Sequence, residues 1–152
     1  MMLAADADEY FGFDLFESGT EDDDRREFNA KKRVALRQVS QFLRQFPFDH
    51  ELYRGNSRQT LPKFLAEHGE NCVDFAFIDG GHSVATIASD WQHVKRAVKP
   101  SGVVVFDDYY TDGPDTNKVG CNQIVEKLKH DVLAGADPVL GGGRVHLVTV
   151  TC

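Results

Sequence analysis

The sequence predicts an α/β fold with a doubly wound, mostly parallel sheet and helices on both faces. Short apolar stretches alternate along the chain with longer stretches whose apolar residues recur at helical spacing, and this alternation is typical of parallel strands joined by crossover helices. Residues 72–78 are almost continuously apolar, as expected of a strand that is covered on both faces. The last two strand candidates follow each other closely, which predicts an antiparallel hairpin at one edge of the sheet.

Four elements are predicted in the first half of the chain. The aromatic stretch Tyr10–Phe13 is typical of a short strand. An acidic run suits a helix N-terminus, and the apolar spacing after it predicts a helix over Arg25–Phe46. The next predicted strand is Glu51–Arg54, and a helix over Arg58–His68 follows with Ser57 as its N-cap.

The second half of the chain continues the alternation. The strand over residues 72–78 is followed by an amphipathic helix over residues 83–98 and then by a turn. A buried strand, a further helix and two closing elements complete the domain. These last elements are strand 103–106, helix 121–133, a loop or short strand over 137–143, and strand 145–150.

Composition excludes several classes of protein. The net charge of −7 argues against a partner such as nucleic acid, which requires a cationic surface. No apolar run approaches the roughly 18 residues that a membrane span requires, and the first residues lack the pattern of a signal peptide. Cys72, Cys121 and Cys152 form no CxxC pair, so neither a disulfide framework nor a zinc knuckle is indicated. A cytoplasmic location is the expectation.

Acidic side chains follow both buried strands of the second half. Asp79 comes directly after the first of these strands, and Asp107 and Asp108 come directly after the second. The carboxyl ends of neighbouring parallel strands meet at one edge of the sheet, where ligands bind in this class of fold. Crowded carboxylates repel one another unless a cation or a proton compensates, and oxygen-only ligands favour Mg²⁺. The sequence therefore predicts a metal-capable acidic site. The alternative for each aspartate is to cap the helix that follows or to end a sheet edge.

Two stretches resemble a block of class I S-adenosylmethionine-dependent methyltransferases. They are Phe77-Ile78-Asp79-Gly80-Gly81-His82-Ser83 and Val98-Lys99-Pro100-Ser101-Gly102-Val103-Val104-Val105-Phe106-Asp107-Asp108-Tyr109. They look like the small-molecule O-methyltransferases similar to macrocin O-methyltransferase and the cephalosporin hydroxylase group, whose pattern reads FIDGxHSY and then LKPGGxxxxDDY. Ser101 replaces a glycine of this pattern, and Val84 replaces its aromatic residue. The segment Tyr10–Glu17 is similar to the family's strand 2.

The resemblance implies a Rossmann-like fold and a site for S-adenosylmethionine at the carboxyl ends of its strands. Asp14, at the end of the strand that is similar to strand 2, would accept hydrogen bonds from the ribose hydroxyls. Asn56, Ser57 and Arg58 follow the next strand and would lie beside the adenine. The resemblance also places Asp79 among the residues expected to bind the cofactor.

The resemblance also implies a metal and a base. Asp79, Asp107 and Asp108 match the divalent-metal ligands of catechol-type O-methyltransferases, in which the metal holds the substrate hydroxyl and lowers its pKa. His82 lies three residues after Asp79, where those enzymes carry a basic residue that removes the hydroxyl proton. A histidine suits that task because its ordinary pKa is about 6.5. The alternative for His82 is to cap the next helix or to hydrogen-bond an aspartate.

One part of the family's pattern is not found in this sequence. No strand 1, with its acidic and glycine-rich loop of the type E-x-G-x-x-x-G, precedes Tyr10. That strand is central in the family, between strands 2 and 4, so omitting it leaves two inner sheet edges without partners. Three explanations stay open: a chain that starts late, a homodimer in which a second copy fills the gap, or direct pairing of strands 2 and 4.

We therefore expect a single domain over residues 1–152 that acts as a metal-assisted, S-adenosylmethionine-dependent O-methyltransferase. Mg²⁺ is the expected metal, and the acceptor is expected to be a small hydroxylated molecule. Two alternatives remain. One is a non-catalytic remnant of the fold that serves as a binding or oligomerisation module, and the other is a metal-dependent hydrolase or hydroxylase.

Overall fold

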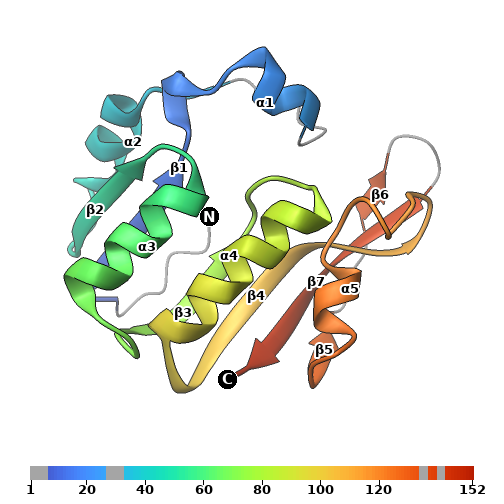
Figure 1. Ribbon diagram of the computed structural model, residues 1–152. Helices are drawn as coiled ribbons and strands as arrows, with labels where there is room; N and C mark the ends of the chain where they lie inside the picture. The colour runs from blue at the N-terminus through green and yellow to red at the C-terminus, as the bar shows by residue number, and fades with distance from the viewer. Residues whose placement is uncertain (1–6, 27–32, 134–136, 140–142) are drawn as a thin grey trace.

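The strands form two separate sheets in the computed structural model, which describes residues 7–26, 33–133, 137–139 and 143–152 (Figure 1). The first sheet pairs two parallel strands, β1 (Glu9–Asp14) and β2 (Asp49–Arg54). The second sheet has the order β3-β4-β7-β5, and the short β6 also pairs with β7. Its strands are β3 (Val73–Ile78), β4 (Val98–Asp112), β5 (His130–Val132), β6 (Asp137–Val139) and β7 (Gly143–Thr151).

Three helices accompany these strands in front of the sheets as Figure 1 draws them. The two long helices, α3 (Ser57–His68) and α4 (Val84–Ala97), pack against each other and run side by side. The short α5 (Asn122–Val125) contacts β4 and α4. The strand β3 is parallel to β4, as β1 is to β2, so the predicted α/β architecture with parallel strands and helices is confirmed. The second sheet is mixed, because β7 is antiparallel to β4, β5 and β6.

Helices cover both faces of the first sheet. Phe11 of β1 contacts Phe64 of α3 with 4.9 Å between the ring centroids. Its neighbour Tyr10 contacts Phe48, which stacks on Phe46 just beyond the end of α2 (Leu36–Leu43). Because successive side chains of a strand point to opposite faces, α3 and the end of α2 lie on opposite faces of this sheet.

Two apolar clusters form the core. The larger lies where β3, β4 and β7 meet α4 and α5; its buried members are Ile78, Ile87, Val98, Val104, Phe106, Cys121, Val125, Val148 and Val150. The smaller joins the two sheets through α3; it comprises Tyr53, Phe64, Leu65 and Ala97, with Phe11, Phe13, Cys72 and Val73 packed against them. The second cluster therefore holds β1 and the start of β3 against the same helix.

The prediction that residues 72–78 are covered on both faces is correct for one face only. Ala76 and Ile78 pack into the larger core cluster. Phe75 and Phe77 point to the opposite face and are 40% and 42% exposed. The helix α4 covers only the first of these faces, which is the physical reason for the difference.

The strand β1 does not pair with β3 in the described part of the chain. Its one ladder is with β2, and the ladder of β3 is with β4. These two strands correspond to strands 2 and 4 of the resemblance, so the explanation that they pair directly is wrong. The edge of each strand that faces away from its partner stays unpaired within its described sheet.

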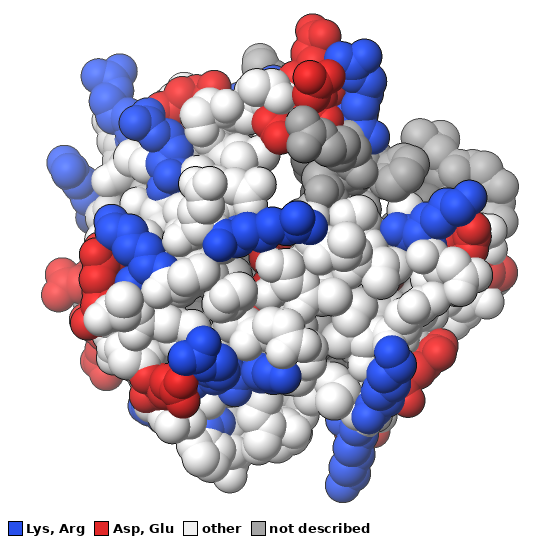
Figure 2. All heavy atoms as spheres, in the orientation of Figure 1, with Lys and Arg blue, Asp and Glu red and all other residues white. Residues whose placement is uncertain are grey.

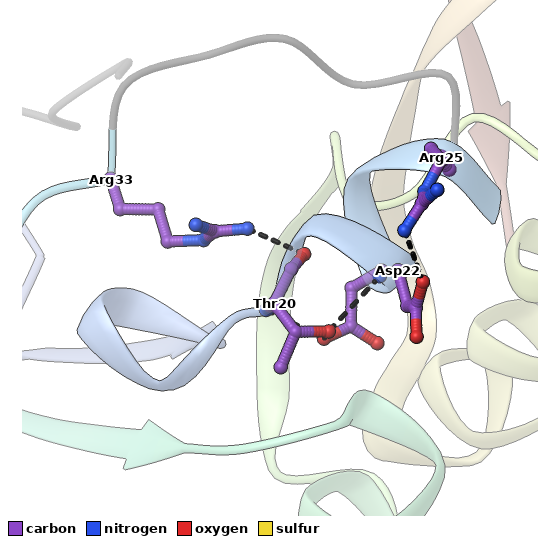
Figure 3. A network of polar contacts seen from close by, with 5 residues as sticks. Thr20, Asp22, Arg25 and Arg33 are labelled. Atoms are coloured by element: carbon purple, nitrogen blue, oxygen red, sulfur yellow. Dashed lines mark hydrogen bonds and ion pairs between the residues drawn. The ribbon is translucent and has the colours of Figure 1, made fainter.

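The predicted single helix over Arg25–Phe46 is wrong. A 3-10 turn (Phe16–Ser18) leads to α1 (Glu21–Arg26), the described residues 33–35 are not helical, and α2 begins only at Leu36. Thr20 and Asp23 cap α1 reciprocally, since each side chain accepts the other's backbone N–H at 3.2 and 2.8 Å. Arg33 donates to the Thr20 carbonyl at 2.6 Å, and Arg25 pairs with Asp22 (Figure 3). The acidic run thus caps a short helix of its own.

The predicted helix over residues 121–133 is also shorter than expected. It ends at Val125, and the residues predicted as its last turns form β5, which pairs with Val148–Val150 of β7. The predicted antiparallel hairpin is confirmed, because β6 pairs with residues 143–145 of β7. Pairing with β7 offers residues 130–132 a complete strand ladder, which outweighs their modest helical pattern.

Most charged side chains of the face drawn in Figure 2 lie along its margins, and a lysine or arginine side chain also crosses its middle. Lysine and arginine side chains stand beside aspartate and glutamate side chains along the margins, while uncharged atoms cover much of the middle. Among the described residues, no helix is both long enough and apolar enough to span a membrane.

Candidate functional site

The parallel ladder of β3 and β4 brings the predicted acidic strand ends together. Its last residue pair joins Ile78 to Phe106, so Asp79 and Asp107 are the next residues on two neighbouring strands. β4 continues beyond this point to Asp112, but its pairing with β7 is interrupted between Phe106 and Tyr109. The interruption lifts the backbone out of regular register at the aspartates, as expected of a bulge beside a site.

Asp108 lies between a histidine and a tyrosine. Its Oδ1 accepts a hydrogen bond from the Tyr110 hydroxyl at 2.8 Å, and its Oδ2 lies 3.8 Å from Nε2 of His82. The side chains of His82 and Asp108 are 21% and 13% exposed, so the pair is largely shielded but reachable. Nδ1 of His82 makes no hydrogen bond within the described part of the chain. The imidazole therefore has one nitrogen toward a carboxylate and the other available to a substrate.

The backbone of residues 118–121 links the His82 loop to the Asp108 turn. Gly120 N–H donates to the His82 carbonyl at 2.9 Å, and Cys121 N–H donates to the Asp108 carbonyl at 3.0 Å. Asp108 has a φ of +62° and Gly120 a φ of +88°. A Cβ atom on Gly120 would lie 2.6 Å from the Asp108 carbonyl oxygen. Glycine is therefore required where this segment passes between the two site loops.

Asn122 fixes the backbone of Tyr110. Its Oδ1 accepts from the Tyr110 N–H at 3.0 Å and its Nδ2 donates to the Tyr110 carbonyl at 2.8 Å. Asn122 is 5% exposed. The sequence did not predict these two hydrogen bonds. The usable signal was the spacing of Asp108 and Tyr110, because residues two apart on a strand point to the same face.

A glycine and a buried carboxylate lie beneath the loop that carries Asp79 and His82. A Cβ on Gly80 would be 3.4 Å from Oδ2 of Asp90, which lies on α4 and is 7% exposed. Ser83 caps α4 by accepting the Thr86 N–H at 3.2 Å. The predicted alternative that His82 itself caps this helix is therefore wrong, because Ser83 occupies the N-cap position.

The surroundings of Asp108 keep two groups protonated. Burial, the hydrogen bond to Asp108 and the nearby carboxylates raise the pKa of Tyr110. Burial, with the charge of Asp108 as the next cause, raises the pKa of the Cys121 thiol to about 12. The Tyr110 hydroxyl is therefore a stable donor at neutral pH, and Cys121 is a neutral thiol in the core rather than a nucleophile.

The three predicted metal ligands do not form a closed ligand set as the structure places them. Within the described residues, only Glu51, Glu67 and His68 bring three candidate ligand atoms to within 4.8 Å of one another, and these lie elsewhere. Asp107 accepts the Asp108 N–H at 2.8 Å, and Asp108 is engaged with Tyr110. Those contacts orient both carboxylates toward the protein. A metal at this site would require them to turn.

Four of the predicted cofactor residues, Asp14 and Asn56–Arg58, lie at the carboxyl end of the first sheet, whereas Asp79 follows β3 in the second sheet. Asp14 ends β1 and is exposed; its Oδ1 accepts the Phe16 N–H, and its other oxygen makes no hydrogen bond to the described residues. Asn56, rather than Ser57, is the N-cap of α3, and it accepts the Arg58 N–H at 3.0 Å. An exposed carboxylate beside a helix N-terminus suits the hydroxyls and polar ring of a nucleoside.

Comparisons with known proteins agree with the fold. Residues 1–109 match the family model described as a methyltransferase domain. Among solved structures, the fold is similar to that of the O-methyltransferase TomG from Streptomyces achromogenes, which is involved in tomaymycin synthesis and was solved in complex with SAM. The TM-score is 0.53 at 18% identity, over 97% of this chain and 74% of TomG. No curated protein matches the sequence.

Proposed function

Because the chain belongs to the methyltransferase-domain family, we propose that it transfers a methyl group from S-adenosylmethionine to a hydroxyl of a small molecule. The observation that carries this proposal is the arrangement of His82, Asp108 and Tyr110 at the carboxyl end of the β3–β4 ladder. S-adenosylmethionine, when bound, supplies a methyl group on a positively charged sulfur. Such a transfer depends mainly on positioning and on removal of the acceptor's proton.

His82 is the proposed general base. With Nε2 toward Asp108, its Nδ1 takes the hydroxyl proton while the acceptor oxygen forms its bond to the methyl carbon and the carbon–sulfur bond breaks. The imidazolium that results is stabilised by the Asp108 carboxylate. Asp14 with Asn56, Ser57 and Arg58 would hold the nucleoside of the cofactor. Asp79 follows β3 in the second sheet and would contact the cofactor from that sheet.

The test is product formation by variants of the proposed base. We expect His82→Asn to lower turnover about 10²- to 10⁴-fold, the range for general base catalysis, with catechol as the probe acceptor and S-adenosylhomocysteine as the measured product. His93→Asn is the matched control, because its imidazole lies on α4 and bonds the Ser89 carbonyl at 2.8 Å. Equal turnover of the two variants would refute the assignment of His82.

Binding of the cofactor is tested separately by calorimetry. Titration with S-adenosylhomocysteine, with and without Mg²⁺, should release heat in both cases, and Asp14→Asn should weaken it. If neither titration releases heat, the cofactor proposal for this chain is rejected. Metal assistance through Asp79, Asp107 and Asp108 remains a proposal. It requires heat from Mg²⁺ alone that is lost in the Asp79→Ala/Asp108→Ala double variant.

A second candidate function is a binding or oligomerisation module without catalysis. The observation that favours it is that β1 and β3 each have one edge without a strand partner among the described residues, since such edges recruit further strands. On this proposal a second copy completes the sheet. Sedimentation of the purified chain distinguishes the two states: a homodimer supports pairing between copies, and a monomer across the micromolar range rejects it.

A further inference from the structure

The tyrosine next to the proposed base pair is held rigidly. Tyr110 is 9% exposed, and Asn122 holds both its backbone N–H and its carbonyl. A Cβ on Gly120 would lie 2.7 Å from its ring, so the ring packs directly against that backbone. A tyrosine fixed at its backbone and ring keeps its hydroxyl in one place.

That hydroxyl determines how the Asp108 carboxylate is turned. Its bond to Oδ1 is 2.8 Å long and leaves Oδ2 as the oxygen that faces His82. The backbone of Asp108 is fixed as well, because Cys121 N–H holds its carbonyl at 3.0 Å while φ is +62°. With the backbone set, the remaining freedom of Asp108 is rotation of its side chain, and Tyr110 restricts that rotation.

We propose that Tyr110 is a positioning residue for the methyl transfer, acting through Asp108 on His82. This inference rests on the proposed function. The hydroxyl of Tyr110 holds Asp108 so that one carboxylate oxygen faces the imidazole and keeps the base in its working orientation. Without that bond, the carboxylate is free to turn toward solvent and the imidazole loses its partner.

The test compares Tyr110→Phe with Tyr53→Phe. Tyr53 is a matched control because it is also buried, at 4% exposure, and its hydroxyl donates to the Glu67 carboxylate at 2.9 Å, away from His82. We expect Tyr110→Phe to lower kcat about 5- to 30-fold with the KM for S-adenosylmethionine unchanged. We expect Tyr53→Phe to leave both values within about twofold of wild type.

A double-mutant cycle separates positioning from a general structural effect. In the His82→Asn background, Tyr110→Phe should change kcat less than twofold, since the imidazole it positions is gone. A loss in that background as large as in wild type overturns the proposal. So does a fall in kcat for Tyr53→Phe as large as that for Tyr110→Phe.

A measurement without turnover keeps this inference apart from the proposed function. The carboxyl ¹³C chemical shift of Asp108, recorded at one fixed pH, should differ from wild type in Tyr110→Phe and equal the wild-type value in Tyr53→Phe. If wild-type protein methylates no acceptor, the proposed function fails while this resonance still reports whether Tyr110 orients Asp108. An unchanged resonance in Tyr110→Phe overturns the positioning inference even where turnover is measured.

Discussion

Replacing Gly120 by alanine tests whether the segment 118–121 sets the geometry of the site. At Gly120 the φ of +88° alone costs a residue with a side chain about 1–2 kcal/mol. The new methyl carbon would also lie 2.6 Å from the Asp108 carbonyl oxygen and 2.7 Å from the Tyr110 ring, both of which are fixed. Relieving such a contact adds about 1–3 kcal/mol. We expect a total loss of about 2–5 kcal/mol in the free energy of unfolding.

Gly69 provides the matched control. Its φ is +83°, and a Cβ there would meet no atom within 4 Å. At its ψ of −171°, Gly69→Ala carries a conformational cost of about 1–3 kcal/mol, at least as large as that at Gly120, without the steric one. Because each kcal/mol moves the melting temperature of a chain of this size by roughly 2–4 °C, we expect Gly120→Ala to melt about 2–12 °C below Gly69→Ala.

The assay is urea unfolding and thermal melting of both variants beside wild type, together with turnover on catechol. Gly120→Ala should also lose turnover, since its N–H holds the His82 carbonyl at 2.9 Å, whereas Gly69→Ala should keep it. Equal stability of the two variants would show that the backbone around Gly120 shifts to accommodate the new methyl group without loss of unfolding free energy. The reasoning about a rigid link between the His82 and Asp108 loops would then be refuted.

Two further predictions concern the same region. Asn122→Ala removes both bonds to the Tyr110 backbone and leaves a buried N–H and carbonyl without partners, so urea unfolding should show a loss of about 2–4 kcal/mol. The exposed Asn117→Ala should change stability by less than about 0.5 kcal/mol, and similar losses for both would contradict the reading. The second prediction concerns alkaline pH. Because burial raises the pKa of the Cys121 thiol from 9.0 to about 12, the folded state binds more protons than the unfolded state in that window. Stability is therefore lost as pH rises from 9 toward 12, and Cys121→Ala should flatten the slope of unfolding free energy measured between pH 8 and 10.5 in urea. If Cys121→Ala left the dependence of the unfolding free energy on pH unchanged, this thiol would not be its cause.

Much of the fold could be predicted because it depends on local patterns. The strands β1, β2 and β3 lie within two residues of their predicted bounds, and α4 lies within one residue of its predicted range, 83–98. These features depend on apolar periodicity and on capping chemistry, both of which are local. The failures depend on distant partners. Residues 130–132 became a strand because β7 offered an edge, and the pattern of one segment does not contain that information.

The candidate site divides in the same way. The neighbourhood of Asp79 and Asp107 follows from a parallel ladder whose last pair is Ile78 and Phe106, and the sequence predicts such ladders well. The orientation of Asp108 does not follow, because it depends on a positive φ and on a hydroxyl two residues along the chain. The N-cap of α3 could not be assigned from the sequence either, because Asn56 and Ser57 are adjacent and both residue types are preferred at this position. The folded backbone places Asn56 there.

The two halves of the site are supported by different parts of the molecule. The base half is linked by main-chain bonds from residues 118–121, so its geometry does not require any partner for the free edge of β3. The half around Asp14 lies on the first sheet, which shares no ladder with the second across residues 7–26, 33–133, 137–139 and 143–152. The described elements join them mainly through the packing of α3 on α4 and the apolar cluster beneath it. Side-chain packing fixes the distance between two elements less rigidly than a strand ladder does, because it lacks the directional bonds of a ladder. A strand paired between β1 and β3 would therefore tighten the alignment of Asp14 with His82 more than the geometry of His82 and Asp108 themselves.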